Sequence, residues 1–251
     1  MSPFDAYFAR LRDYEAALEA RGAEAYIWSE WVLDRPAGAE NPPLILKENT
    51  AVELGGPQSI GTSITMWTED PSLVFDGRIT LLGEDIPRLG ASGASAVPFG
   101  QVTLVGGPSL SSGIQVELER GSHAGDMVRG YLVRGAGNRI WSRVSREAYG
   151  AGLSFRLVGT QILNKIRQRI EGVSAAEIMF VTSSHEDVAE LESIGAQVRK
   201  ISHDLRRQRL REVAEGVYEC AATVSCDVCP DNSVCTEIRQ ILVIRKKGSG
   251  Q

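Results

Sequence analysis

Two kinds of segment are missing from this 251-residue sequence. No apolar stretch reaches the roughly 18–20 residues that are needed to cross a bilayer. The first residues, 1–5, contain neither the basic segment nor the apolar run of a secretory leader. We therefore expect neither a membrane protein nor a secreted one, and we expect a cytoplasmic location.

Histidine is scarce, and its distribution argues against two common kinds of site. The three histidines, His123, His185 and His203, are dispersed along the chain and do not have the spacing of a metal-binding pair. Ser122 and Asp126 flank His123, but such a group in one short segment is common by chance. We therefore reject a hydrolase with a Ser-His-Asp triad.

The composition predicts a folded protein whose charge is unevenly distributed. Hydrophobic residues make up 43% and charged residues 24% of the chain, which is enough apolar material for a core. Residues 1–198 hold 17 Lys and Arg against 25 Asp and Glu, whereas residues 199–251 hold 10 against 7. An acidic body with a basic end is not typical of a nucleic-acid-binding protein, so nucleic acid is not an expected partner.

The hydrophobic patterns predict helices and strands in mixed order. Apolar spacing of three and four residues predicts helices over 4–21 and 154–170, and a further helix that Ser184 caps and that ends near Ile194. Short β-branched segments predict strands. These strands are expected at 59–68, 78–83, 101–105, 127–133, 139–144 and 177–182. The fold class that follows is α+β, a mixed sheet with flanking helices, joined to a small C-terminal cysteine-cluster loop.

The four cysteines all lie near the end of the chain. Cys220, Cys226, Cys229 and Cys235 fall within 16 residues, and the preceding 219 residues contain none. A disulfide framework would distribute its cysteines, so the clustering indicates a metal site. Four thiolates with one central Cys-x2-Cys pair and wider arms favour a [4Fe–4S] cluster. Zinc is the alternative, although structural zinc sites usually have two such pairs.

Because all four cysteines serve as ligands in this interpretation, we expect a structural or electron-transfer cluster and not a catalytic one. The spacing is similar to that of the cluster loop in endonuclease III-like DNA glycosylases. The helix-hairpin-helix of those enzymes is absent from this sequence.

A basic run precedes the cysteines. Residues 199–211 hold six Arg and Lys, among them Arg206, Arg207 and Arg209. Arginine binds phosphate in a bidentate manner, so the run is a candidate anion site. It is equally a candidate for a solvated helix face, for a countercharge to the cluster, or for a docking surface for an acidic protein partner.

Several stretches, in this order and spacing, resemble the β subunit of carbon monoxide dehydrogenase/acetyl-CoA synthase. That enzyme joins CO, a corrinoid-borne methyl group and coenzyme A. The resembling stretches are 50–57, 76–80, 98–100, 140–145 and 153–155. Together they look like the middle, non-catalytic part of that subunit.

The resemblance implies a binding role and not the synthesis reaction. The middle region of the family binds coenzyme A through a Trp and several Arg, and it contacts partner proteins. Carried over to this sequence, those positions are Trp141, Arg139 and Arg143. The family's nickel–iron–sulfur A-cluster needs a Cys-Gly-Cys arrangement that this sequence lacks, so we do not expect acetyl-CoA synthesis by this chain alone.

These observations predict four parts and three competing functions. The parts are an N-terminal helix and linker (1–44), an acetyl-CoA synthase-like domain (45–205), a basic helix with the four-cysteine module (206–247) and a flexible tail (248–251). The first function is an iron–sulfur subunit or accessory of a larger anaerobic enzyme system for CoA or one-carbon chemistry. The second is a zinc-stabilised interaction module, and the third is an acyl-CoA-transforming enzyme whose catalytic residues the sequence does not identify.

Overall fold

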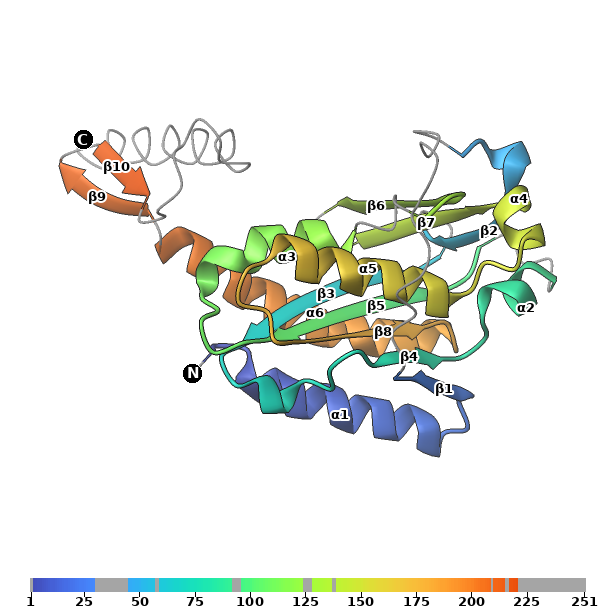
Figure 1. Ribbon diagram of the computed structural model, residues 1–251, viewed down its shortest axis with the longest axis horizontal. Coiled ribbons are helices and arrows are strands. Elements are labelled where there is room, and N and C mark those ends of the chain that lie inside the picture. Colours follow the sequence, from blue (N-terminus) through green and yellow to red (C-terminus); the bar gives the residue numbers. More distant parts are fainter. Residues whose placement is uncertain are drawn as a thin grey trace, which may run out of the picture. The chain divides into compact units, whose positions relative to one another are not determined.

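A computed structural model describes most of the chain (Figure 1). The described residues are 2–29, 45–56, 59–91, 96–123, 128–136, 139–208, 210–214 and 217–220, with side chains described as far as residue 204. The chain forms two compact units, Met1–Arg199 and Lys200–Gln251. Each unit is described by itself.

The first unit is built on a five-stranded sheet of order β1-β4-β8-β5-β3. The strands are β1 (Ala25–Trp28), β4 (Ile79–Leu82), β8 (Ala175–Val181), β5 (Phe99–Gly106) and β3 (Gly61–Thr68). β4 runs parallel to β8 and β3 parallel to β5, whereas β8 with β5 and β1 with β4 are antiparallel. The expected mixed sheet is therefore confirmed.

Helices cover both faces of this sheet (Figure 1). On one face lie α1 (Asp5–Ala20) and the first part of α6 (His185–Gln208), which are joined by hydrogen bonds such as that from the Tyr14 hydroxyl to the Asp187 carbonyl, 2.8 Å. On the other face lie α3 (Gln115–Ser122) and α5 (Phe155–Arg169). The layers are thus helix, sheet, helix, because β3, β4, β5 and β8 are buried on both sides, whereas the edge strand β1 is largely exposed.

The centre of the core is a group of three aromatic rings between the sheet and α5. Phe99, Phe155 and Phe180 are each fully buried. Their ring centroids lie 5.7 Å apart for Phe99 and Phe155, 6.2 Å for Phe99 and Phe180, and 4.8 Å for Phe155 and Phe180. These rings tie the two central strands to the first turn of α5.

A second, antiparallel sheet of order β2-β7-β6 packs beside β3. Its strands are β2 (Thr50–Gly55), β7 (Arg139–Ser145) and β6 (Tyr131–Ala136). The contact between the sheets is so close that a side-chain carbon at Gly61 would collide with the carbonyl oxygen of Ile140. Only glycine allows this approach, which sets the position of β7 relative to the central sheet.

The remaining elements are short. They are α2 (Ile86–Ala91), α4 (Arg146–Gly150) and the 3-10 turns η1 (Lys47–Asn49), η2 (Pro71–Leu73) and η3 (Ser112–Ile114). In the second unit, β9 (Leu210–Ala214) and β10 (Val217–Cys220) form an antiparallel hairpin.

The expected helices are confirmed, with one wrong boundary. Helices α1 and α5 occupy the predicted segments, and the Ser184 hydroxyl accepts a hydrogen bond from the Asp187 N–H, 3.1 Å, as a helix cap. The prediction that this helix ends near Ile194 is wrong, since α6 continues to Gln208. Gly195 lies inside this helix and packs against Ile64 of the sheet, since a side-chain carbon added to Gly195 would lie 3.1 Å from Ile64 Cγ1.

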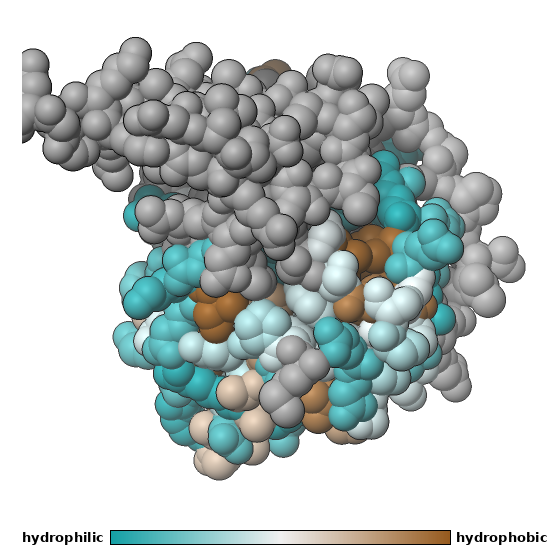
Figure 2. Space-filling model, turned by 90° about the vertical axis from the view of Figure 1, so that its left-hand side faces the viewer, coloured by the Kyte–Doolittle hydropathy of each residue, from teal (hydrophilic) through white to brown (hydrophobic). Residues whose placement is uncertain are grey.

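Within the described ranges, no helix is both long and apolar enough to cross a membrane. One end of the molecule is shown in Figure 2, where the coloured residues are largely hydrophilic and the apolar ones form separate small patches. Scattered exposed apolar side chains of this kind are normal on protein surfaces.

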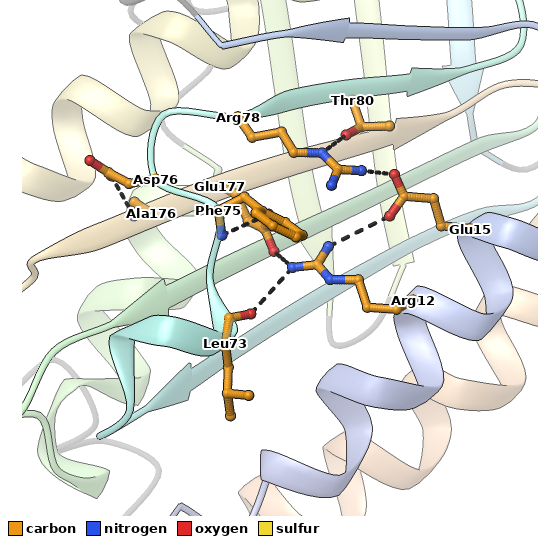
Figure 3. Close-up of polar contacts among 9 residues, drawn as sticks. All are labelled: Arg12, Glu15, Leu73, Phe75, Asp76, Arg78, Thr80, Ala176 and Glu177. Atoms are coloured by element: carbon orange, nitrogen blue, oxygen red, sulfur yellow. Dashed lines mark hydrogen bonds and ion pairs between the residues drawn. The ribbon is translucent and has the colours of Figure 1, made fainter.

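A network of paired charges attaches α1 to the sheet (Figure 3). Arg12 forms an ion pair with Glu177 of β8, and its guanidinium also lies 3.6 Å from the carboxylate of Glu15. Arg78 pairs with Glu15 and donates to Thr80 Oγ1, 2.9 Å. Burial raises the pKa of the Glu177 carboxyl, and the positive charge of Arg12 opposes this shift. Arg12 therefore stabilises the charged form of the buried Glu177 carboxylate more than any other cation does.

We expect substitution of Arg12 to destabilise the protein strongly. The Glu177 side chain is only 5% exposed, so Arg12→Met leaves a buried carboxylate without its nearest cation. The expected loss in the free energy of unfolding is about 2–4 kcal/mol, measured by urea denaturation. Arg21→Met is the control at the C-terminal cap of the same helix, because the Arg21 side chain is 52% exposed, and this variant should lose far less stability than Arg12→Met. Equal losses for the two variants would contradict the structural role of the network.

Candidate functional site

The three residues carried over by resemblance lie on one face of the second sheet. Along β7, Ile140, Ser142 and Val144 are buried, whereas Arg139 is exposed and Trp141 and Arg143 are partly exposed. Alternate residues of a strand point to opposite faces. The inner face of β7 therefore packs on the core, and its outer face presents Arg139, Trp141 and Arg143 together.

The neighbouring strands add two residues that the sequence did not identify. In the antiparallel register, Glu53 of β2 lies opposite Arg143, and Arg134 of β6 lies opposite Trp141. Residues directly opposite in such a pair have Cβ atoms ~4.5–5.5 Å apart and share a face of the sheet. Nothing in the sequence gives the register of these strands, so only the structure could reveal Glu53 and Arg134.

The indole of Trp141 is held on two sides. The guanidinium carbon of Arg143 lies 4.5 Å from the ring centroid, which is the geometry of a cation–π contact. The pyrrole edge faces the turn after β2, where a side-chain carbon added to Gly56 would lie 2.5 Å from Trp141 Cδ1 and 3.0 Å from Nε1. The indole N–H is buried and has no hydrogen-bond partner among the described residues.

Arg143 is itself fixed by two hydrogen bonds. Its Nε donates to Glu53 Oε2 over 3.1 Å, and its Nη1 donates to the Ile45 carbonyl over 2.8 Å. The side chains of Arg143 and Glu53 are 16% and 14% exposed. The positive charge of Arg143 is therefore largely balanced inside the protein.

The other arginines of this outer face are more accessible. Arg139 is exposed and makes no ion pair with any residue that the structure describes. Arg134 is also exposed, and its Nη1 donates to the Val133 carbonyl over 2.9 Å. The outer face of the second sheet, which we call the Trp141 face, thus combines an aromatic ring with three cations and one anion: Trp141, Arg134, Arg139, Arg143 and Glu53. Such a surface can stack a planar group and bind anions.

The other predicted site residues lie largely outside the described part of the chain. Arg206 and Arg207 belong to the last turn of α6, so this part of the basic run is helical. Their side chains are not among the described ones, and Arg209 lies outside the described residues. Their predicted role as an anion site stays a prediction.

The predicted role of the four cysteines as metal ligands also stays a prediction. Cys220 is the last residue of β10, and its side chain together with Cys226, Cys229 and Cys235 lies outside the described residues. Within the part of the chain that is described, no group of three or more His, Cys, Asp or Glu side chains is arranged to hold a metal ion.

The contact between Gly56 and Trp141 gives a test of how tightly the indole is held. Gly56→Ala should lower the free energy of unfolding by about 1–3 kcal/mol beyond the cost of its left-handed backbone conformation, φ +88°, because the new methyl group collides with the ring. Gly152→Ala is the matched control, since Gly152 has φ +81° and nothing within 4 Å of the added carbon. Urea denaturation with tryptophan emission as the signal measures both. If the two variants lose the same stability, Gly56 does not hold the ring.

Comparison with known proteins identifies the family of the chain. The family model for the CO dehydrogenase/acetyl-CoA synthase complex beta subunit matches residues 41–188, a range that includes the whole Trp141 face. Subunit beta 1 of the acetyl-CoA decarbonylase/synthase complex of Methanosarcina thermophila is 25% identical over 205 residues, covering 77% of this chain and 42% of that protein. The corresponding beta subunit of Methanothermobacter thermautotrophicus is 26% identical over 200 residues, covering 75% and 41%.

A third relative is longer. The alpha subunit of carbon monoxide dehydrogenase/acetyl-CoA synthase from Moorella thermoacetica is 25% identical over 239 residues, covering 91% of this chain and 31% of that protein. The chain therefore spans less than half the length of these relatives. Because the family model matches more than half of the chain, the chain belongs to the CO dehydrogenase/acetyl-CoA synthase beta subunit family.

Proposed function

We propose that this chain is a subunit or accessory of an acetyl-CoA synthase-type enzyme complex and that its Trp141 face binds coenzyme A. The single observation that carries the proposal is the gathering of Trp141 and the arginines of β6 and β7 on one outer face. The names of the relatives support a place in a complex, since two of those compared here are subunits of acetyl-CoA decarbonylase/synthase complexes.

The chemistry of coenzyme A suits this face. The ligand has an adenine base, which can stack on an indole, and several phosphate charges, which guanidinium groups bind. Arg143 covers part of the Trp141 ring, and its charge is balanced by Glu53. The phosphates are therefore assigned to the exposed arginines, Arg139 and Arg134, and the base to the uncovered part of the indole.

The proposed role is binding and not bond formation. The described residues supply an aromatic platform and cations but no group of metal-ligating side chains. A complex partner would then provide the reacting centre, and this chain would bring coenzyme A to it. In this proposal the Trp141 face binds coenzyme A, and the cysteines take no part in that binding.

Titration calorimetry with coenzyme A tests this function. Because stacking of one base contributes about 1–3 kcal/mol, Trp141→Ala should raise the Kd roughly 5- to 150-fold. Arg139→Ala should raise it less and should flatten the dependence of Kd on salt, since one phosphate contact is lost. Arg129→Ala is the control, because that side chain is exposed and pairs with Glu147 of α4. An unchanged Kd in Trp141→Ala would remove the proposed site.

We further propose that Cys220, Cys226, Cys229 and Cys235 hold a [4Fe–4S] cluster with a structural or electron-transfer role. The support is their spacing in the sequence, four thiolates within 16 residues. Such a cluster would fit a subunit of a redox complex. A single zinc ion bound by the same thiolates is the alternative, and it would make the C-terminal part a folded interaction module.

Metal analysis distinguishes the two. Protein purified without oxygen should contain about four iron atoms per chain and absorb broadly near ~400 nm. About one zinc per chain and no colour would establish the zinc alternative. Cys226→Ser and Cys229→Ser should each lose the metal, and Ser193→Ala on the exposed side of α6 should retain it. Cysteine variants that keep both metal and stability would disprove either kind of site.

A further inference from the structure

Glu53 has no role in the coenzyme A contacts proposed above, yet its carboxylate is built into the Trp141 face. It lies on β2 directly opposite Arg143, and its Oε2 accepts the Arg143 Nε–H over 3.1 Å. The two residues are 90 positions apart in the chain. The pair is therefore a product of the tertiary fold and not of local sequence.

The pair controls the orientation of a guanidinium that would otherwise be mobile. An arginine side chain has several rotatable bonds and loses much of its conformational entropy when it is held in one geometry. Here Nε donates to Glu53, and Nη1 donates to the Ile45 carbonyl over 2.8 Å. Hydrogen bonds at two nitrogens therefore hold the guanidinium in one orientation. The guanidinium carbon of this group lies 4.5 Å from the centre of the Trp141 ring.

The carboxylate also decides which arginine is available to an anion. Glu53 neutralises Arg143, and both side chains are mostly buried, so a phosphate approaching Arg143 also meets the Glu53 charge. Arg139 of the same strand has no such carboxylate among the described residues. The anion contact thus shifts to Arg139, and Arg143 is left to support the ring.

From this geometry we infer that Glu53 is a positioning residue of the Trp141 face, which acts through Arg143 to hold the indole in one orientation. The inference rests on the proposed coenzyme A site for its functional meaning. Its structural content, that the ring orientation depends on the Glu53 carboxylate, can be tested without any ligand.

The test uses fluorine NMR on the full chain labelled with fluorotryptophan. The four tryptophans give four resonances, and the one missing from Trp141→Phe identifies Trp141. In Glu53→Gln this resonance should shift or broaden while the other three keep their positions. The variant should fold, because the backbone of Glu53, whose carbonyl accepts from the Val97 N–H over 2.9 Å, is unchanged.

Two further variants separate positioning from general damage. Glu147→Gln removes the same charge and also breaks an ion pair with an arginine, Arg129, at an exposed position. It should leave the Trp141 resonance where it is. Glu53→Asp keeps the charge on a shorter side chain and should restore the resonance in part.

Titration with coenzyme A completes the experiment. If the native protein binds, Glu53→Gln should raise the Kd at least three-fold, although Glu53 is an anion whose removal alone would favour an anionic ligand. A Trp141 resonance that is the same in Glu53→Gln and native protein overturns the inference, and so does an unchanged or tighter Kd. Absence of coenzyme A binding by the native protein overturns the proposed function instead, and the ligand-free spectra still decide whether Glu53 positions the ring.

Discussion

The pairing of β2 with β7 is the interaction on which the Trp141 face depends. It places Glu53 opposite Arg143 and Gly55 opposite Trp141, and the turn that follows then lies against the pyrrole edge of the indole. Because side chains alternate along a strand, a shift of this register by one residue would place Glu53 on the opposite face of the sheet from Trp141 and Arg143. The contact of the Glu53 carboxylate with Arg143, and the fit of the turn against the indole, therefore depend on this register.

The central sheet supports that pairing from behind. Val52, Leu54 and Ile140 on the inner side of the small sheet are buried, and a backbone bridge connects Leu54 with Val97, just ahead of β5. The close contact of Gly61 with Ile140 leaves no space for the two sheets to slide. On such a support the proposed binding face would be preorganised, which reduces the entropy lost when a ligand is bound.

Buried or partly buried Arg–Glu pairs occur at two places in the first unit. Arg12 and Arg78 are paired with Glu177 and Glu15 where α1 meets the sheet, and this network attaches the helix. The pair of Arg143 with Glu53 lies at the outer face, where it supports a ring. In each case the carboxylate neutralises the charge of its arginine, so the arginine attracts anions less. In the proposed site a phosphate would therefore bind at accessible cations such as Arg139.

The sequence alone located several of the elements and the chemistry that they could carry, although it did not predict β1, β2 or α3, and it placed the strand β6 too early. The apolar spacing located α1 and α5, the ordered motifs indicated the family, and alternation along residues 139–144 already implied that Arg139, Trp141 and Arg143 share one face. These are local properties, because a strand or helix period fixes which neighbours point the same way. Only the tertiary structure decided the strand order, the continuation of α6 beyond Gly195, and the places of Glu53, Arg134 and Glu177. Those depend on register and on contacts between residues far apart in the chain, which no local pattern encodes.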